Sequence, residues 1–183
     1  LTPGTIILNK LLKSGIKKEN IHILHPREKK IKGCKCFIDL DTLKKKLKLK
    51  QLDLFIVGAP ARAPPGRNAG DIVKEIINKD IAKSMTIISS GFAETHAGKK
   101  TSDEIKELLK IKHKTKKGGP LINGPNTIGI KYHEKTTMFN PWAKSSYNEI
   151  GKKNAAIICQ SGAFMAMSLS DFAYAVDPPI VIA

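Results

Sequence analysis

The amino-acid sequence predicts an α/β fold built on a mainly parallel sheet. Short apolar segments of strand length alternate with segments of helical periodicity along the 183 residues, and this alternation is typical of βαβ units. Small and turn-forming residues follow three of the predicted strands, where open α/β sheets bind their ligands. Hydrophobic residues are 41% and charged residues 26% of the chain, a composition that indicates a globular domain and argues against disorder.

The first part of the chain contains two predicted helices and two predicted strands. Residues 5–14 carry apolar side chains at helical spacing, so we expect a helix there. Residues 21–25 form a short apolar strand, and residues 41–48 form a lysine-rich amphipathic helix with two leucines four residues apart. Residues 52–58 are almost continuously apolar, which is typical of a strand buried on both faces.

The same alternation continues after the second strand. Residues 70–79 have isoleucines and a valine on one side of a helix, and residues 85–91 form the next strand. Residues 101–112 form another amphipathic helix, for which Ser102 is the expected N-cap. This spacing of strands and helices predicts right-handed crossovers and a ligand site beyond the carboxyl ends of the strands.

The last third of the chain is expected to hold a linker between two α/β units. Residues 120–124 and 155–160 are predicted strands, and residues 162–175 are an apolar helix rich in alanine and methionine. The segment from Lys131 to Lys153 is polar and is expected to be irregular. The final residues, 179–183, are typical of a strand without a partner, so we expect an internal piece of a longer protein.

Charge is the strongest compositional feature. Lysine and arginine total 32 against 16 acidic residues, a formal net charge of +16 that suits an anionic partner. Only Arg27, Arg62 and Arg67 are arginines, and aromatic residues are 5%, whereas nucleic-acid readers use arginine forks and aromatic stacking. We therefore expect a solvated lysine-rich surface and no nucleic-acid partner. The apolar runs are too short for a membrane span, and the sequence has no recognisable signal peptide. We therefore expect a cytoplasmic protein.

The three cysteines are too few and too scattered for a disulfide framework. Cys34, Cys36 and Cys159 form an odd set, which fits a reducing compartment. Cys34 and Cys36 lie on the same face of a strand, with His22 and His25 just upstream. A zinc site there is one alternative, although the spacing matches none of the usual zinc knuckles. The other is that His22 and Cys36 fill strand faces.

Three turns are expected at one edge of the sheet: Gly58-Ala59-Pro60, Ser89-Ser90-Gly91 and Gly124-Pro125-Asn126. Glycine allows a backbone to approach a ligand closely, and asparagine supplies both a donor and an acceptor. Each string alone is compatible with a plain turn. Together, at corresponding strand ends, they indicate a ligand site.

A fourth turn, Gln160-Ser161-Gly162-Ala163, precedes the last predicted helix. Helix N-termini attract anions because their first N–H groups lack intrahelical partners, so this turn is either a phosphate site or a serine N-cap. Nucleotide hydrolysis and esterase chemistry have no support, because no Walker motif and no Gly-x-Ser-x-Gly motif is present. His96 is a candidate general base without an evident carboxylate partner.

Taken in order, these motifs resemble the nucleoside-diphosphate-forming acyl-CoA synthetases, the family of ADP-forming acetyl-CoA synthetase and the succinyl-CoA synthetase alpha subunit. The resemblance runs through nearly the whole chain. The motifs that carry it are Leu24-His25-Pro26-Arg27, Gly33-Cys34-Lys35-Cys36, Val57-Gly58-Ala59-Pro60-Ala61, Ser90-Gly91-Phe92-Ala93-Glu94, Gly124-Pro125-Asn126-Thr127-Ile128-Gly129 and Gln160-Ser161-Gly162-Ala163.

The resemblance implies a Rossmann-like CoA-binding domain at residues 1–135, a linker at 136–153 and the start of a flavodoxin-like ligase domain at 154–183. It implies an acid–thiol ligase that makes acyl-CoA from a small carboxylic acid, CoA and ATP or GTP. A histidine is phosphorylated, its phosphate passes to the acyl group, and CoA then takes the acyl group. That histidine lies beyond Ala183, so no catalytic residue is assigned here. The nucleotide and magnesium are expected on an ATP-grasp domain or subunit, in cis or in trans, within an oligomer.

The resemblance also assigns binding roles by motif. We expect the phosphohistidine's phosphate to be held by Ser161, Gly162 and Ala163, and we expect no metal ligand in this chain. The first strand and most of the glycine-rich turn of the family are lacking, and His96 stands where relatives usually have glycine. The residues expected to bind CoA are Thr2, Pro3, Gly4, Pro26, Arg27, Gly58, Ala59, Pro60, Ser90, Gly91, Phe92 and Asn126.

Two alternatives to the ligase remain at this point. The same pair of domains occurs fused to protein acetyltransferases, so the chain is alternatively a non-catalytic domain that senses CoA or acyl-CoA. A histidine in the second domain favours the ligase, and an acetyltransferase-like tail favours the sensor. The second alternative is that the chain is a basic nucleic-acid-binding protein. This hypothesis predicts DNA binding with a steep salt dependence.

Overall fold

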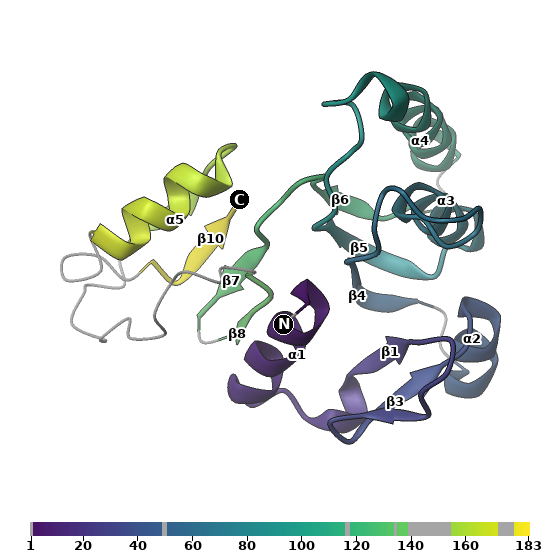
Figure 1. The fold of residues 1–183 in the computed structure, drawn as a ribbon, viewed down its shortest axis with the longest axis horizontal. Coiled ribbons are helices and arrows are strands. Elements are labelled where there is room, and N and C mark those ends of the chain that lie inside the picture. The colour runs from purple at the N-terminus through teal and green to yellow at the C-terminus, as the bar shows by residue number, and fades with distance from the viewer. Residues whose placement is uncertain (1, 49–50, 116–117, 134, 139–154, 172–177) are drawn as a thin grey trace. The chain divides into compact units, whose positions relative to one another are not determined.

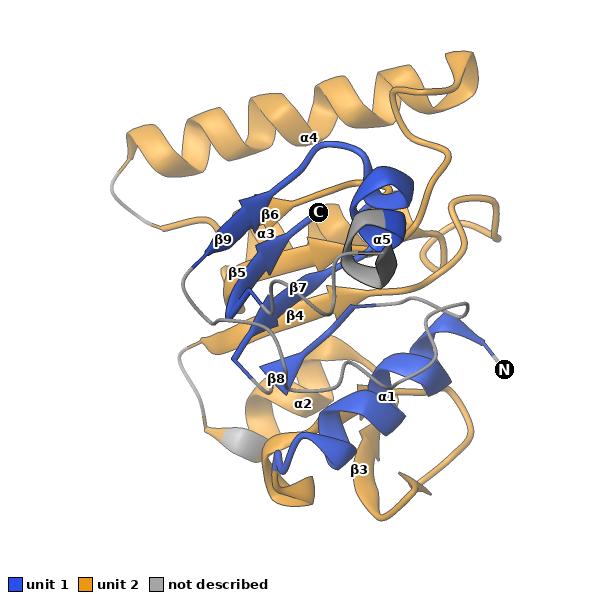
Figure 2. Cartoon of the chain, turned by 90° about the vertical axis from the view of Figure 1, so that its left-hand side faces the viewer, with its two compact units in different colours: residues 1–16, 127–183 blue, residues 17–126 orange. Residues whose placement is uncertain are grey.

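The computed structural model describes the chain apart from residues 1, 49–50, 116–117, 134, 139–154 and 172–177 (Figure 1). The described residues form two compact units (Figure 2). One consists of residues 17–126, and the other combines residues 1–16 with residues 127–183. Each unit has a hydrophobic core of its own, so each is described by itself. The domain boundaries implied by the resemblance stay a prediction.

The unit of residues 17–126 is an α/β structure with two three-stranded sheets. In the first sheet β3 lies between β1 and β2, and β1 and β3 run parallel. In the second sheet all strands are parallel, in the order β4-β5-β6. This arrangement confirms the predicted Rossmann-like, mainly parallel fold. The strands are β1 (His22–Leu24), β2 (Lys30–Ile31), β3 (Cys34–Phe37), β4 (Leu52–Val57), β5 (Ala82–Ile87) and β6 (Leu121–Asn123).

Three helices connect these strands, after a short 3-10 turn, η1 (Lys18–Asn20). They are α2 (Leu40–Leu47), α3 (Ala69–Lys79) and α4 (His96–Lys114). Each begins after a side chain that accepts a hydrogen bond from the third helical N–H group. The caps are Asp39 with Thr42 N–H at 2.7 Å, Asn68 with Asp71 N–H at 2.8 Å, and Thr95 with Gly98 N–H at 3.1 Å.

The core of this unit lies between the all-parallel sheet and its helices. Strand residues Val57, Met85 and Ile87 pack in one cluster with Val73 and Ile76 of α3, and all five are almost fully buried. The predicted helix at 70–79 supplies Val73, Ile76 and Ile77 to this core, and the predicted strand at 52–58 supplies Val57. Helices α3 and α4 also contact each other.

The second unit has a mixed four-stranded sheet in the order β8-β7-β10-β9. Strand β10 is parallel to β9 and antiparallel to β7. Its core is smaller and contains Met138, Met165, Val181 and Ala183. Its elements are α1 (Pro3–Lys13), β7 (Ile130–Tyr132), β8 (Lys135–Thr136), β9 (Ala156–Ile158), α5 (Gly162–Asp171) and β10 (Ile180–Ile182).

Three expectations about local structure were wrong. Helix α4 begins at His96 rather than at residue 101, because Thr95 caps it; Ser102 lies inside the helix and donates to the Gly98 carbonyl at 3.1 Å. Residues 131, 132, 135 and 136 lie in the segment expected to be irregular and instead belong to β7 and β8. The terminal strand β10 was expected to lack a partner, yet it pairs with two strands.

The predicted end of the last helix, at residue 175, falls outside the described residues. In the described part of the chain, no helix combines the length and apolar character that crossing a membrane requires.

Candidate functional site

Three predicted turns follow the three strands of the all-parallel sheet. Gly58-Ala59-Pro60 follows β4, Ser89-Ser90-Gly91 comes just after β5, and Gly124-Pro125-Asn126 follows β6. Because β4, β5 and β6 are parallel in one sheet, the turns lie at the same edge. The structure therefore brings together the CoA-binding residues expected from residue 58 to residue 126.

Ser89 connects the three turns. Its hydroxyl donates to the Ala59 carbonyl at 2.5 Å, and its own carbonyl accepts from the Asn126 N–H at 3.0 Å. The middle turn thus holds one neighbour through its side chain and the other through its backbone. Ser89 belongs to the predicted turn, but its sequence position predicted no role for it. Its position after the central strand marks it as a turn residue, but the sequence does not indicate its hydrogen-bond partners.

Conformational constraints at this edge explain the residue types found there. Gly91 has a φ of +95°, and a Cβ atom there would lie 2.8 Å from the Ala61 Cβ. Asn126 has a φ of +58°, which asparagine tolerates better than most residues. The Pro60 carbonyl accepts from the Ala69 N–H at 3.0 Å, which joins the first turn to the start of α3.

Phe92 and Ser90 lie on opposite sides of the boundary between core and solvent. Phe92 is only 3% exposed and packs in the core of the unit. Its side chain therefore anchors the turn. Ser90 is exposed and can offer its hydroxyl to one. The motif thus separates into a packing residue and a residue available for binding.

Glu94 stabilises the turn after β5 by a backbone hydrogen bond. Its carboxylate accepts from the Gly91 N–H at 2.5 Å. Burial raises the pKa of Glu94, but hydrogen bonds from the N–H groups of Glu94, Gly91 and Phe92 outweigh burial and leave the pKa lowered. The charged form of this side chain is therefore favoured by the turn that it closes. Glu94 is part of the Ser90–Glu94 motif, but no function was expected for it.

The turn after β1 contains the predicted residues Pro26 and Arg27, which are both exposed. The ring nitrogen Nδ1 of His25 accepts from the N–H groups of Arg27 and Glu28, at 3.3 and 3.0 Å. His25 therefore shapes the turn and leaves the Arg27 side chain in solvent. The guanidinium is available to an anionic group, as the resemblance implies.

Thr2, Pro3 and Gly4 belong to the other unit, where they start helix α1. Thr2 is the N-cap, and its hydroxyl accepts from the Thr5 N–H at 3.4 Å. A Cβ atom at Gly4 would have no neighbour within 4 Å, so glycine is not required there by packing within the structure. These residues are not placed relative to the turns of the parallel sheet.

Ser161, Gly162 and Ala163 also lie in that unit, at the start of α5. The Ser161 hydroxyl accepts from the Phe164 N–H at 3.3 Å, which is an N-cap interaction. A Cβ atom at Gly162 would lie 2.5 Å from Ile128 Cγ1, so glycine here permits close packing. The N-cap geometry is present, and phosphate binding by these residues stays a prediction.

Cys34 and His22 contribute to packing in the unit of residues 17–126. Cys34 is fully buried, and the His22 ring packs edge-on against Phe37 with centroids 5.7 Å apart. Burial and the nearby Lys35 lower the pKa of His22. Within the described ranges, no cluster of three or more His, Cys, Asp or Glu side chains is arranged to hold a metal ion. His96 is the exposed first residue of α4.

The fold is similar to the crystal structure of PH0766 from Pyrococcus horikoshii OT3, with a TM-score of 0.68 and 25% sequence identity. The alignment covers 100% of this chain and 37% of PH0766, so the chain spans little more than a third of that protein's length. No family model and no curated protein matches the chain. The likeness supports a Rossmann-like fold of the CoA-binding type without singling out a family.

Proposed function

We propose that this chain is the CoA-binding portion of an acid–thiol ligase of the nucleoside-diphosphate-forming acyl-CoA synthetase type. The observation that carries the proposal is the set of turns after β4, β5 and β6, joined through Ser89 at the carboxyl edge of one parallel sheet. Open α/β sheets bind their ligands at this edge. The order of the motifs, which matches that of the synthetases, adds the ligand class.

In this proposal CoA is the substrate that the chain binds, and its phosphates suit a molecule with a net charge of +16. The exposed Arg27 meets the nucleotide end, and the turns from Gly58 to Asn126 line the pantetheine arm. Ser161, Gly162 and Ala163 receive the phosphohistidine's phosphate from a residue beyond this chain. The ATP-grasp part, ATP or GTP with magnesium, and the partner copies of an oligomer complete a cytoplasmic enzyme.

In this proposal the complete enzyme makes acyl-CoA in three group transfers. A histidine nitrogen takes the γ-phosphoryl group of the nucleotide and releases the diphosphate. The carboxylate of the acid then takes the phosphoryl group and forms an acyl phosphate. The CoA thiolate attacks the acyl carbon, forms the thioester and releases phosphate. This chain contributes the binding of CoA, which keeps the thiol in place for the last transfer.

Calorimetric titration of the chain with CoA tests the binding claim. We expect saturable binding of CoA and weak binding of NAD, which shares the ADP portion but lacks the pantetheine arm. Equal affinity for both ligands, or no binding of CoA, would overturn the assignment of the sheet edge to CoA.

The ligase claim requires the product of the complete gene. Incubation with γ-labelled ATP and magnesium is expected to give an acid-labile, base-stable phosphoprotein that loses its label on addition of ADP. If CoA binds and no label appears, the ligase hypothesis is wrong and the domain pair is a CoA sensor.

A further inference from the structure

Glu94 places a negative charge at the turn that follows β5. Its side chain is exposed, and its carboxylate accepts from the Gly91 N–H at 2.5 Å. Burial raises the pKa of Glu94, but the N–H groups of Glu94, Gly91 and Phe92 outweigh burial and lower it. The side chain is therefore ionised at neutral pH. The carboxyl edge of the sheet thus carries an anion that belongs to the protein itself.

The N–H group that Glu94 occupies is of the kind that binds phosphate in many α/β proteins. The turn between a strand and the next helix presents successive backbone N–H groups, and such groups bind anions. Here the Gly91 N–H is already bonded to Glu94. A phosphate group can bind this turn only by displacing a carboxylate of the same sign. The internal carboxylate therefore competes with any anionic ligand.

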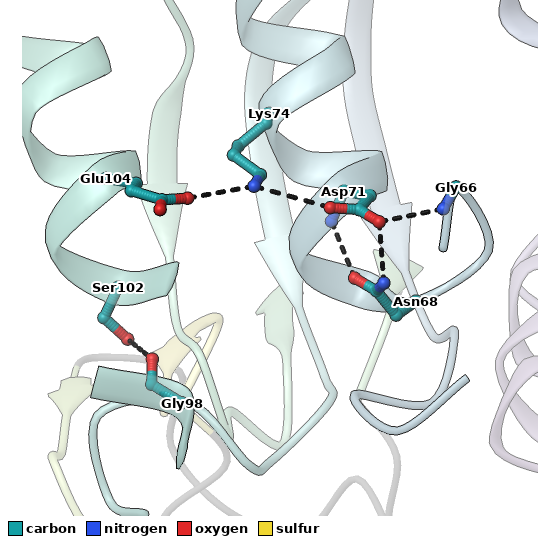
Figure 3. A network of polar contacts seen from close by, with 7 residues as sticks. All are labelled: Gly66, Asn68, Asp71, Lys74, Gly98, Ser102 and Glu104. Carbon is teal, nitrogen blue, oxygen red and sulfur yellow. Dashed lines mark hydrogen bonds and ion pairs between the residues drawn. The ribbon is translucent and has the colours of Figure 1, made fainter. Parts of the chain in front are cut away.

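The carbonyl groups of the same turn are also bonded within the protein. Thr95 Oγ1 lies 3.0 Å from the Phe92 carbonyl oxygen and 3.3 Å from that of Gly91, and the Thr95 N–H donates to the Phe92 carbonyl at 2.9 Å. Thr95 also caps α4 at Gly98, whose carbonyl accepts from the Ser102 hydroxyl inside the helix (Figure 3). These contacts hold the turn against the start of α4, so Glu94 acts from a fixed position.

The charge of Glu94 is not neutralised by a cation. Among the residues that the structure describes, the ion pairs do not include Glu94. Glu104, by contrast, lies 3.0 Å from Lys74 (Figure 3), and Glu107 lies 2.6 Å from Lys110. Backbone N–H groups stabilise a carboxylate without cancelling its charge. The turn after β5 is therefore locally negative in a chain with a net charge of +16.

The polar groups that this turn offers to a ligand suit an uncharged partner. Ser90 is exposed and offers its hydroxyl, and the Glu94 carboxylate accepts from N–H and O–H donors. The pantetheine arm of CoA is uncharged and carries amide N–H groups, whereas the nucleotide portion carries phosphates. A carboxylate attracts amide donors and repels phosphate. The exposed Arg27, at the turn after β1, has the opposite preference.

We propose that Glu94 is a specificity-determining residue, which excludes phosphate groups from the turn after β5 and so reserves the turn for an uncharged part of the ligand. That this part is the pantetheine arm rests on the proposed function. The exclusion of phosphate does not, because it follows from the contact between Glu94 and Gly91. The role of Glu94 gives a physical reason for one orientation of CoA, with its phosphates toward Arg27 and its arm along the sheet edge.

Titration of the full chain with inorganic phosphate, at constant ionic strength and followed by amide NMR shifts, tests the exclusion. In the wild type we expect no saturable shift at Gly91 or Phe92. Glu94→Ala frees the Gly91 N–H and removes the charge, so we expect saturable shifts there and a phosphate affinity at least about tenfold higher. Glu94→Gln removes the charge but keeps an acceptor for the Gly91 N–H, so it should gain a smaller part of this affinity.

Glu107→Gln is the matched control for charge. Glu107 is exposed in the second half of α4, away from the turn, so its loss changes the net charge equally and should leave phosphate without effect at Gly91. An equal gain in Glu107→Gln would show general charge attraction and overturn the role of Glu94. Saturable phosphate binding at Gly91 in the wild type, as tight as in Glu94→Ala, would overturn it too. So would the absence of any gain in both Glu94 variants.

Pantetheine and CoA separate this inference from the proposed function. We expect both to shift the Ser90 and Gly91 amides of the wild type. If neither binds while Glu94→Ala gains phosphate, Glu94 excludes phosphate and the proposed function is refuted. If CoA binds the wild type while neither Glu94 variant gains phosphate, the proposed function is supported and the role of Glu94 is refuted.

Discussion

Ser89 is the residue on which the candidate site depends most directly. Its hydroxyl bonds the turn after β4, and its carbonyl bonds the turn after β6. Ser89→Ala removes the first of these bonds, and a typical hydrogen bond contributes about 0.5–1.5 kcal/mol to stability. We expect a loss of that size in urea unfolding and a fall in CoA affinity on the order of tenfold, measured by calorimetry.

Ser84→Ala is a matched control for this change. Ser84 lies on β5, the strand that precedes Ser89, and its hydroxyl donates to the Asp53 carbonyl at 2.6 Å, away from the carboxyl edge. We expect a comparable loss of stability with unchanged CoA affinity. If both variants weaken CoA binding equally, the effect of Ser89→Ala comes from a general loss of stability. The proposed CoA site at the carboxyl edge is then not supported.

Substitution of Gly91 by alanine tests whether the turn after β5 requires glycine. With φ at +95° and the Ala61 Cβ 2.8 Å from an added Cβ, Gly91→Ala combines backbone strain with a steric clash. The left-handed region alone costs a non-glycine residue about 1–2 kcal/mol, so we expect a loss of at least about 2 kcal/mol in urea unfolding.

Gly66→Ala separates the two contributions. Gly66 has a φ of +75° but open space around its would-be Cβ, so only the backbone strain of about 1–2 kcal/mol applies. A loss at Gly91 no larger than that at Gly66 would mean that the turn relaxes away from Ala61. The close approach would then have no energetic consequence.

At the scale of elements, the boundaries of α3 depend on Asp71. The Gly66 N–H and then the Asn68 amide lower the pKa of this carboxyl, with Lys74 adding to the effect. The unfolded chain therefore binds its proton at a higher pH, near about 3.9. The stability that charged Asp71 contributes is present above that pH and is lost as the pH falls through the lower, folded-state pKa.

Asp71→Asn is accordingly expected to be less stable than the wild type at pH 7. The difference should shrink as the pH falls below about 4 and through the lower pKa of Asp71 in the folded protein, where the wild-type carboxyl takes up its proton. Urea unfolding across a pH series measures this. Asp53→Asn, at a carboxylate 91% exposed and paired only with Lys83, should show a small difference throughout. A gap at Asp71→Asn that stays constant with pH would contradict the role of its charge.

The elements show which parts of the fold a sequence can predict. Strand β4 and helix α3 were predicted because long apolar runs and helical spacing dominate them. Helix α4 was predicted too short because its first turn, His96 to Lys100, has no apolar stripe; the cap at Thr95 decides its start. Strands β7 and β8 were missed because they are short and lysine-containing, and they form only through pairing with each other and with β10.

The candidate site, like the fold, was predictable only in part. Turn residues after parallel strands must share an edge, so the grouping of the three turns followed from the topology. The role of Ser89 did not, because a serine in a turn has many possible partners and only the paired strands bring Ala59 within 2.5 Å of it. The burial of Phe92 was equally hidden, since a phenylalanine in a turn is compatible with either core or ligand.

At the scale of the molecule, two cores of unequal size support the two units. The core of residues 17–126 contains most of the fully buried side chains, including Ile76 at 0% exposure. Among the described residues, the core of the other unit is much smaller, with Met165 at 1% exposure. Apolar burial is the main favourable term in folding, so the larger core should protect its backbone amides better from hydrogen exchange.

Ile76→Ala and Met165→Ala test this difference, because each removes a buried side chain from a helix in one core. Changes of this kind typically cost about 2–5 kcal/mol. We expect Ile76→Ala to accelerate exchange most at β4 and β5, and Met165→Ala to accelerate it most at β9 and β10, as measured by hydrogen–deuterium exchange with mass spectrometry. In the wild type, β9 and β10 should exchange faster than β4 and β5. Uniform acceleration across all four strands in both variants would show one cooperative core, and the division into two energetic units would be wrong.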